Sequence, residues 1–154
     1  MDHKADKRRK ESRIDIRTYL DRLKYAIEKD SVRLNFQKDR KVDQERSKKY
    51  TNRYTIEQLF PDEDEIEALK RELSFLRVEN YIETLKDTRF PKRSEMRVFG
   101  KHYSGNDVYI KIRVELVSML HANGGSFILV MSFHYSQWDF EESDFPYKKV
   151  RGEK

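Results

Sequence analysis

The chain of 154 residues contains no cysteine, only five glycines and three prolines, and no apolar run as long as a membrane helix. A membrane helix needs about 20 consecutive apolar residues, so no membrane contact is expected. The absence of cysteine excludes disulfides and thiolate metal sites. The four histidines do not show metal-ligand spacing, and we expect neither a metal nor another cofactor. The polar, basic start lacks the apolar region of a secretory signal, which predicts a cytoplasmic protein.

Charged residues are abundant: they make up 40% of the chain, whose net charge is +5. Residues 1–54 hold 18 Lys/Arg against 10 Asp/Glu, whereas residues 55–89 hold 5 against 10. Nine tyrosines, nine phenylalanines and one tryptophan argue against disorder. A basic front segment beside an acidic one is typical of a nucleic-acid binder with a second protein contact. For charge alone, simple solvation is the alternative.

The apolar pattern predicts one α+β domain over residues 12–147, between a disordered polar tail at 1–11 and a polar tail at 148–154. Apolar side chains recur every three or four residues from Ser12 to Asp30 and again over residues 62–79, which predicts two helices.

From residue 95 the apolar period changes to two, which predicts strands. Residues 96–117 are expected to form a hairpin with a turn at Ser104–Asn106, and residues 126–135 a central strand. The expected architecture is therefore N-terminal helices packed on a twisted antiparallel sheet. Residues 80–94 are expected to be an irregular connection.

A polar row lies on one face of the second hairpin strand. Tyr109, Lys111 and Arg113 alternate with four aliphatic side chains, and successive strand residues point to opposite sides of a sheet. The row is either the solvated back of the sheet or the floor of a site for an anion. Both interpretations are open from the pattern alone.

Three stretches resemble, in order, the MqsR-type mRNA-interferase toxins, which are RelE-like ribonucleases of bacterial type II toxin–antitoxin pairs. They are LSFLRVENYIE, MRVFGKHYSGNDVYIKI and ILVMSFH. The resemblance covers most of residues 14–135. It implies a RelE-like fold, metal-independent endoribonuclease activity on mRNA, and neutralisation by a cognate antitoxin protein. Tyr109 and Lys111 match the family's VYxK strand, and His134 matches the basic residue that closes its last strand.

The chemistry of RNA cleavage fits the same residues. The 2′-OH must lose a proton, the 5′-oxygen must gain one, and cations must stabilise the phosphate in the transition state. We expect Tyr109 and His134 to be catalytic, because a histidine titrates near neutral pH and a phenol can donate a proton. Lys111, Arg113 and Lys101 are expected to bind RNA phosphates. Structural roles for each, such as a solvated face or a satisfied histidine, are the alternatives.

Two further features are candidate contacts. Tyr135 and Trp138 follow the last strand and could stack on a base of single-stranded RNA, or cover the sheet edge instead. The basic segment 38–53 has almost no apolar side chains, and it is a candidate contact for the RNA backbone or the antitoxin.

The chain departs from the family at two positions. Relatives carry a lysine where Glu83 falls, and a glutamine with no clear counterpart around Arg97 and Val98. These departures support an alternative, a non-catalytic relative that binds RNA or a protein and is encoded by a mobile element. A DNA-binding regulator of a mobile element is a third hypothesis, but no helix-turn-helix pattern supports it.

Overall fold

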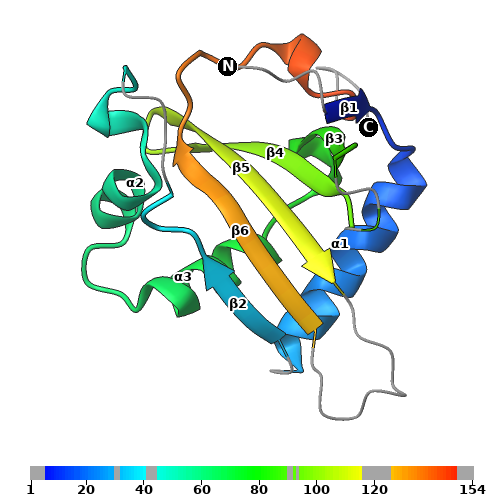
Figure 1. Cartoon of the computed structure of the whole chain (residues 1–154), viewed down its shortest axis with the longest axis horizontal. Helices are drawn as coiled ribbons and strands as arrows, with labels where there is room; N and C mark the ends of the chain where they lie inside the picture. The colour runs from blue at the N-terminus through cyan, green and yellow to red at the C-terminus, as the bar shows by residue number, and fades with distance from the viewer. Residues whose placement is uncertain are drawn as a thin grey trace.

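The computed structural model describes residues 6–29, 32–40, 45–89, 92, 94–115 and 126–148, and a six-stranded sheet organises them. The strands are β1 (Asp6–Arg9), β2 (Val32–Phe36), β3 (Tyr81–Asp87), β4 (Met96–Tyr103), β5 (Asn106–Glu115) and β6 (Ser126–Tyr135), in the spatial order β1-β3-β4-β5-β6-β2. Every pair is antiparallel except β2 with β6, which is parallel. The α+β class is confirmed, whereas the sheet is mixed rather than wholly antiparallel because β2 joins its edge (Figure 1).

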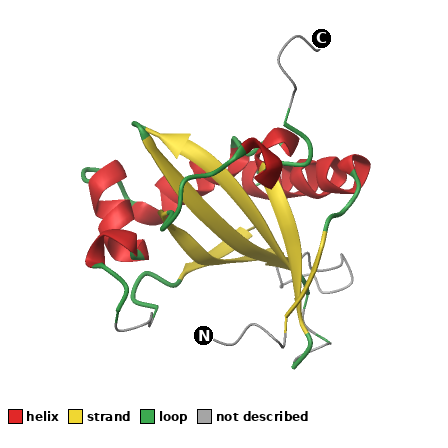
Figure 2. Cartoon of the chain, turned by 90° about the horizontal axis from the view of Figure 1, so that it is seen from above, coloured by secondary structure: helices red, strands yellow, loops and turns green. Residues whose placement is uncertain are grey.

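Three helices accompany the sheet: α1 (Arg13–Glu28), α2 (Asn52–Leu59) and α3 (Glu65–Ser74). Ser12 caps α1 by accepting a hydrogen bond from the Asp15 amide, as the sequence pattern predicts. Asp64 caps α3 in the same way, and its first turn is acidic, which suits the helix dipole. Figure 2 shows the helices gathered on one side of the sheet.

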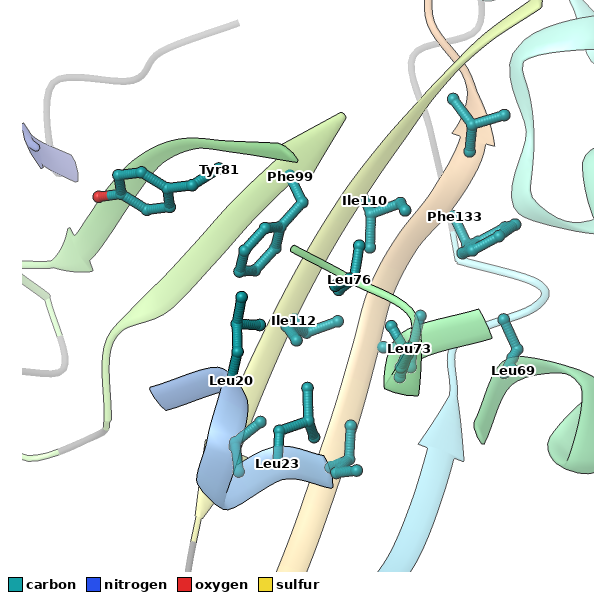
Figure 3. Close-up of a cluster of buried hydrophobic side chains, with 14 of the residues drawn as sticks. Leu20, Leu23, Leu69, Leu73, Leu76, Tyr81, Phe99, Ile110, Ile112 and Phe133 are labelled. Carbon is teal, nitrogen blue, oxygen red and sulfur yellow. The ribbon is translucent and has the colours of Figure 1, made fainter. Parts of the chain in front are cut away.

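The main core lies between the sheet and the helices α1 and α3. Figure 3 shows leucines of the two helices meeting side chains of β4, β5 and β6. The largest fully buried side chains are Tyr81, Phe99, Phe133, Ile16, Leu23, Leu69, Leu73, Leu76, Ile110, Ile112, Ile128 and Val98. Most of them belong to this core, and burying each aliphatic or Phe side chain stabilises the fold by about 1.5–3 kcal/mol. We call this side of the sheet the helix face.

The opposite side, which we call the open face, has a smaller apolar cluster of Ile82, Leu85, Met96 and Val98. Phe140 and Phe145, from the segment that follows β6, pack against it. The Phe140 ring occupies the space beside Gly100, where an added Cβ would lie 2.6 Å from a ring carbon. The C-terminal segment therefore covers part of the open face, and only a glycine leaves room for it.

The N-terminal boundary of the domain lies earlier than expected. Residues 6–9 are the strand β1, paired with β3, rather than part of a disordered tail. Glu11 follows with only 6% of its surface exposed, and it accepts two hydrogen bonds from Arg97, of 2.8 and 3.0 Å. The predicted tails otherwise fall on residues 1–5 and 149–154, outside the described residues.

The segment 80–94, expected to be irregular, contains β3. Its pairing with β4 shifts register between Tyr81 and Glu83. Such a bulge moves later side chains to the other face, so the alternation that would reveal a strand is interrupted.

Candidate functional site on the open face

The polar rows of β5 and β6 lie on the same face of the sheet. Tyr109 is opposite His134, and Lys111 is opposite Ser132. The intervening Val108, Ile110 and Ile112 are buried in the helix-face core, which leaves the polar row on the open face. Together with Arg113, Arg40 and Arg46, these polar residues form what we call the open-face cluster.

His134 and Tyr109 stack as a pair. Their ring centroids are 5.5 Å apart with planes 22° from parallel. His134 is 8% exposed, and its Nδ1 lies 2.9 Å from the carbonyl oxygen of Tyr135. A neutral imidazole in this position donates from Nδ1–H and keeps a lone pair on Nε2.

The pKa of His134 is lowered to about 4. Burial is the main cause, because it penalises the charged imidazolium, and the hydrogen bond to the Tyr135 carbonyl partly opposes it. The positive charges of Arg46, Arg40 and Lys111 lower the pKa further. His134 is therefore neutral at physiological pH and can accept a proton.

Arg40 and Arg46 come from the basic segment 38–53, where the sequence indicated an RNA or antitoxin contact. Arg40 donates from Nη1 to the Ser132 hydroxyl at 3.2 Å. Burial and the charge of Arg46 lower the pKa of Arg40, and Tyr109 partly opposes them. Two arginines that sequence analysis did not single out thus lie beside the polar row.

Asn52, at the start of α2, positions this basic segment. Its side-chain nitrogen donates to the carbonyls of Gln37 and Met131 at 2.8 and 2.9 Å, and its oxygen accepts the Phe133 amide at 3.0 Å. Thr55 accepts the Tyr135 amide at 2.9 Å. Since β2 ends at Phe36, these side chains pair the rest of the β6 edge and hold the chain on both sides of the two arginines.

The arginines of the cluster have no carboxylate partner among the described residues. Within the described part of the chain, no salt bridge joins Arg40, Arg46 or Arg113 to an acidic residue, and the Nε atoms of Arg46 and Arg113 are buried without a hydrogen-bond partner. The charge of Arg113 helps to lower the pKa of Asp87, but the Asp87 carboxylate is hydrogen-bonded to Arg89 instead. A buried donor without a partner costs about 1–3 kcal/mol, and an anionic ligand would supply that partner.

Two predicted site residues lie elsewhere. Lys101 is on the helix face, where its ammonium is 5.7 Å from the ring centroid of Phe75 and 5.5 Å from that of Tyr103. Tyr135 is buried in the main core with its ring against Tyr54, so it offers no face to a base. Alternation along β4 and β6 sends both side chains away from the open-face cluster.

Trp138 does reach the cluster. Its side chain is 51% exposed, and its ring packs edge to face with that of Tyr109 at 5.7 Å. The open face thus carries a row of three rings that begins with His134 and ends in solvent.

The two positions that depart from the toxin family form ion pairs with the N-terminal segment. Glu83 accepts a 2.5 Å hydrogen bond from Arg8. Arg97 binds Glu11 and lies 4.4 Å from the Tyr19 ring centroid, on the helix face. Neither side chain belongs to the open-face cluster.

Among the residues that the structure describes, no group of three or more histidines or carboxylates could hold a metal ion. Within the same ranges, no helix combines the length and apolar character needed to cross a membrane. Comparisons of the chain with protein-family models, with curated proteins and with solved structures gave no match. The function is therefore argued from the chemistry of the open-face cluster.

Proposed function

We propose that the chain is a metal-independent endoribonuclease that cleaves single-stranded mRNA at the open-face cluster. The observation that carries the proposal is a neutral His134 stacked on Tyr109, next to Lys111 and to three arginines (Arg40, Arg46 and Arg113). These arginines lack carboxylate partners in the described ranges. A phosphodiester is an anion that supplies such partners, and a histidine next to it can move the proton that cleavage requires.

The groups allow a balanced reaction. Nε2 of His134 accepts the proton of the 2′-OH, whose oxygen attacks phosphorus. The bond to the 5′-oxygen breaks, and that oxygen takes a proton from the Tyr109 hydroxyl. The products are a 2′,3′-cyclic phosphate and a 5′-hydroxyl, while the cluster's cations stabilise the charge on the phosphate.

The low pKa of His134 is compatible with this role. Part of the lowering comes from Arg46, Arg40 and Lys111. A bound phosphate opposes their charge, so substrate binding raises the pKa of His134 and makes it a stronger base. The base therefore becomes effective when RNA is in place.

The resemblance to MqsR-type toxins supports a proposal about the fold family and the cellular role of the chain. We assign the chain a RelE-like fold and the toxin role in a type II toxin–antitoxin pair. A cognate antitoxin protein would neutralise it by covering the basic open face. Co-expression with the neighbouring small protein should yield a tight complex and relieve growth arrest, and recovery of the chain alone with undiminished toxicity would contradict this part.

Cleavage of a defined RNA in the presence of chelator tests the enzymatic proposal. We expect 5′-hydroxyl and 2′,3′-cyclic phosphate ends, and a rate about 10²–10⁴-fold lower for His134→Ala. Tyr109→Phe should also lose activity while keeping the ring stack. Tyr25→Phe, on the exposed side of α1, is the matched control. Activity that chelator abolishes, or full activity in both site variants, would refute the assignment.

A non-catalytic RNA- or protein-binding relative is the second candidate. Glu83 and Arg97 favour it, because relatives have a lysine where Glu83 falls and a glutamine near Arg97, and both side chains here serve ion pairs instead. RNA binding without cleavage, together with normal growth on induced expression, would identify this alternative.

A further inference from the structure

Trp138 is an exposed aromatic ring that packing alone does not explain. About half of its surface is open to solvent, although Tyr109 and Phe140 flank it at centroid distances of 5.7 and 6.1 Å. The Trp138 ring contacts the Tyr109 ring, which in turn stacks on His134. An RNA strand with a phosphate at the open-face cluster would therefore bring a neighbouring base close to Trp138.

The loop that carries Trp138 is braced. Asp107 accepts a hydrogen bond from the Phe140 amide at 2.9 Å, and its other oxygen lies 3.0 Å from Nδ1 of His102. Ser136 donates its amide to the Asp107 carbonyl and accepts the Trp138 amide on its hydroxyl. Burial alone would raise the pKa of Asp107, but its hydrogen bonds hold that pKa below the usual value. The tryptophan is thus presented on a preorganised loop.

A pocket of about 490 Å³ lies beside the ring, at the tip of the β4–β5 hairpin. This volume is within the range of small-molecule sites, about 300–1,000 Å³. Lys49, Asn106, Gln137 and Asp139 are among the polar residues that line it. In the described part of the chain, the side chains of Gln137 and Asp139 make no hydrogen bond or ion pair. Their polar groups are available to a ligand.

We infer that this pocket binds a nucleobase with an exocyclic amino group, stacked on Trp138 and hydrogen-bonded to Asp139 and Gln137. The inference depends on the proposed RNA cleavage function, which it deepens by naming the base that flanks the cleaved phosphate. Carboxylates repel a phosphate, so a base rather than a second phosphate suits a pocket with Asp107 and Asp139. A carboxylate accepts hydrogen bonds only, and uracil lacks the amino group that adenine, cytosine and guanine would donate.

Equilibrium binding of labelled oligonucleotides tests the inference. The probes are oligouridylate and the same strand with one adenosine, cytidine or guanosine, bound to the catalytically silent His134→Ala protein. Trp138→Ala should weaken binding about ten- to a hundredfold, because stacking on one aromatic side chain is worth about 1–3 kcal/mol. Asp139→Ala should erase the preference for the amino-bearing base. Tyr25→Ala, another exposed aromatic, should change neither quantity, and thermal melts confirm that each variant is folded.

The outcomes separate this inference from the proposed function. Tight RNA binding that is unaffected by Trp138→Ala, or that shows no preference over oligouridylate, overturns the base pocket and leaves the phosphate site standing. Absence of any RNA binding overturns the proposed function and the pocket with it. Loss of affinity in Trp138→Ala together with loss of preference in Asp139→Ala supports the inference.

Discussion

Each face of the sheet holds an arginine that is largely covered, and the two have different surroundings. On the helix face Arg97 donates two hydrogen bonds to Glu11 and lies under the Tyr19 ring. On the open face Arg113 is 9% exposed, yet its Nε has no hydrogen-bond partner among the described residues. A buried charge is tolerated when paired and costly when it is not. Arg97 therefore belongs to a closed structural pair, whereas Nε of Arg113 can still donate a hydrogen bond to a ligand.

The largest loss of stability should come from breaking the ion pair between Glu11 and Arg97 on the helix face. Glu11→Ala leaves the largely covered Arg97 without its buried carboxylate partner, and we expect the free energy of unfolding to fall by about 3–5 kcal/mol. Urea unfolding at pH 7 measures it. Glu83→Ala is the control, because its partner Arg8 is half exposed and such pairs contribute at most about 1 kcal/mol. A loss below about 1 kcal/mol for Glu11→Ala would show that the network is not structural.

His134 on the open face and Glu11 on the helix face should lower the stability of the protein in different pH windows as the pH falls. The pKa of folded His134 is about 4 against 6.5 in its ordinary state, so the unfolded chain binds the proton first as pH falls. Stability should decline from about pH 6.5 to pH 4, by about 3 kcal/mol. The pKa of Glu11 is lowered, since its hydrogen bonds to Arg97 and Thr84 outweigh burial. Its contribution is therefore complete above the ordinary carboxyl pKa and is lost only below it.

Urea unfolding from pH 7 to pH 3 distinguishes these windows. The charged groups that act on His134 are Arg46, Arg40 and Lys111. His134→Gln should flatten the curve above pH 4.5, whereas Glu11→Gln should lower the neutral plateau and change the slope only in the more acidic limb. A wild-type curve that is already flat between pH 6.5 and 4.5 would contradict the assignment of a buried, neutral histidine.

A smaller effect is expected from removing the unpaired arginine. Arg113→Met should leave the free energy of unfolding unchanged or slightly higher, because it removes a buried charge that has no carboxylate partner in the described ranges. RNA binding should weaken, and the slope of log affinity against log salt should fall by about 0.7. Arg17→Met, on the exposed side of α1, serves as the control. Strong destabilisation with an unchanged salt slope would make Arg113 structural.

The smallest effect is expected at Lys101. Because its ammonium lies over two rings on the helix face, Lys101→Ala should leave RNA affinity within about twofold and cost at most about 1 kcal/mol of stability. Lys111→Ala, on the open face, should weaken binding clearly in the same titration. Equal losses in the two variants would show that RNA reaches both faces of the sheet.

Sequence patterns predicted the elements whose periodicity is undisturbed. The stripe of apolar residues in α1 and the alternation in β5 each reflect one buried face, and both elements form as expected. Strand β3 was missed because of its bulge, and β1 because its residues are all charged and its place depends on pairing with residues far along the chain. Long-range pairing leaves no mark in a local pattern.

Only part of the candidate site could be predicted, because local patterns show which residues share a face but not which distant residues they meet. Alternation placed Tyr109, Lys111 and Arg113 in one row, and their convergence with His134 follows from the register of β5 and β6. Arg40 and Arg46 could not be singled out within a uniformly basic segment. Their positions depend on hydrogen bonds from Asn52 to β6, which no spacing within residues 38–53 encodes.

The parallel pairing of β2 with β6 also sets the order of folding. Val32 pairs with Ser126, and Phe36 pairs with Val130, so β2 must wait for a strand that is made much later in the chain. Closing such a long loop costs chain entropy that only the finished pairing offsets, and contacts of this kind form late and slowly. Arg40, Lys111 and His134 therefore meet only after β6 has left the ribosome. A nascent chain that still lacks β6 therefore has no complete open-face cluster.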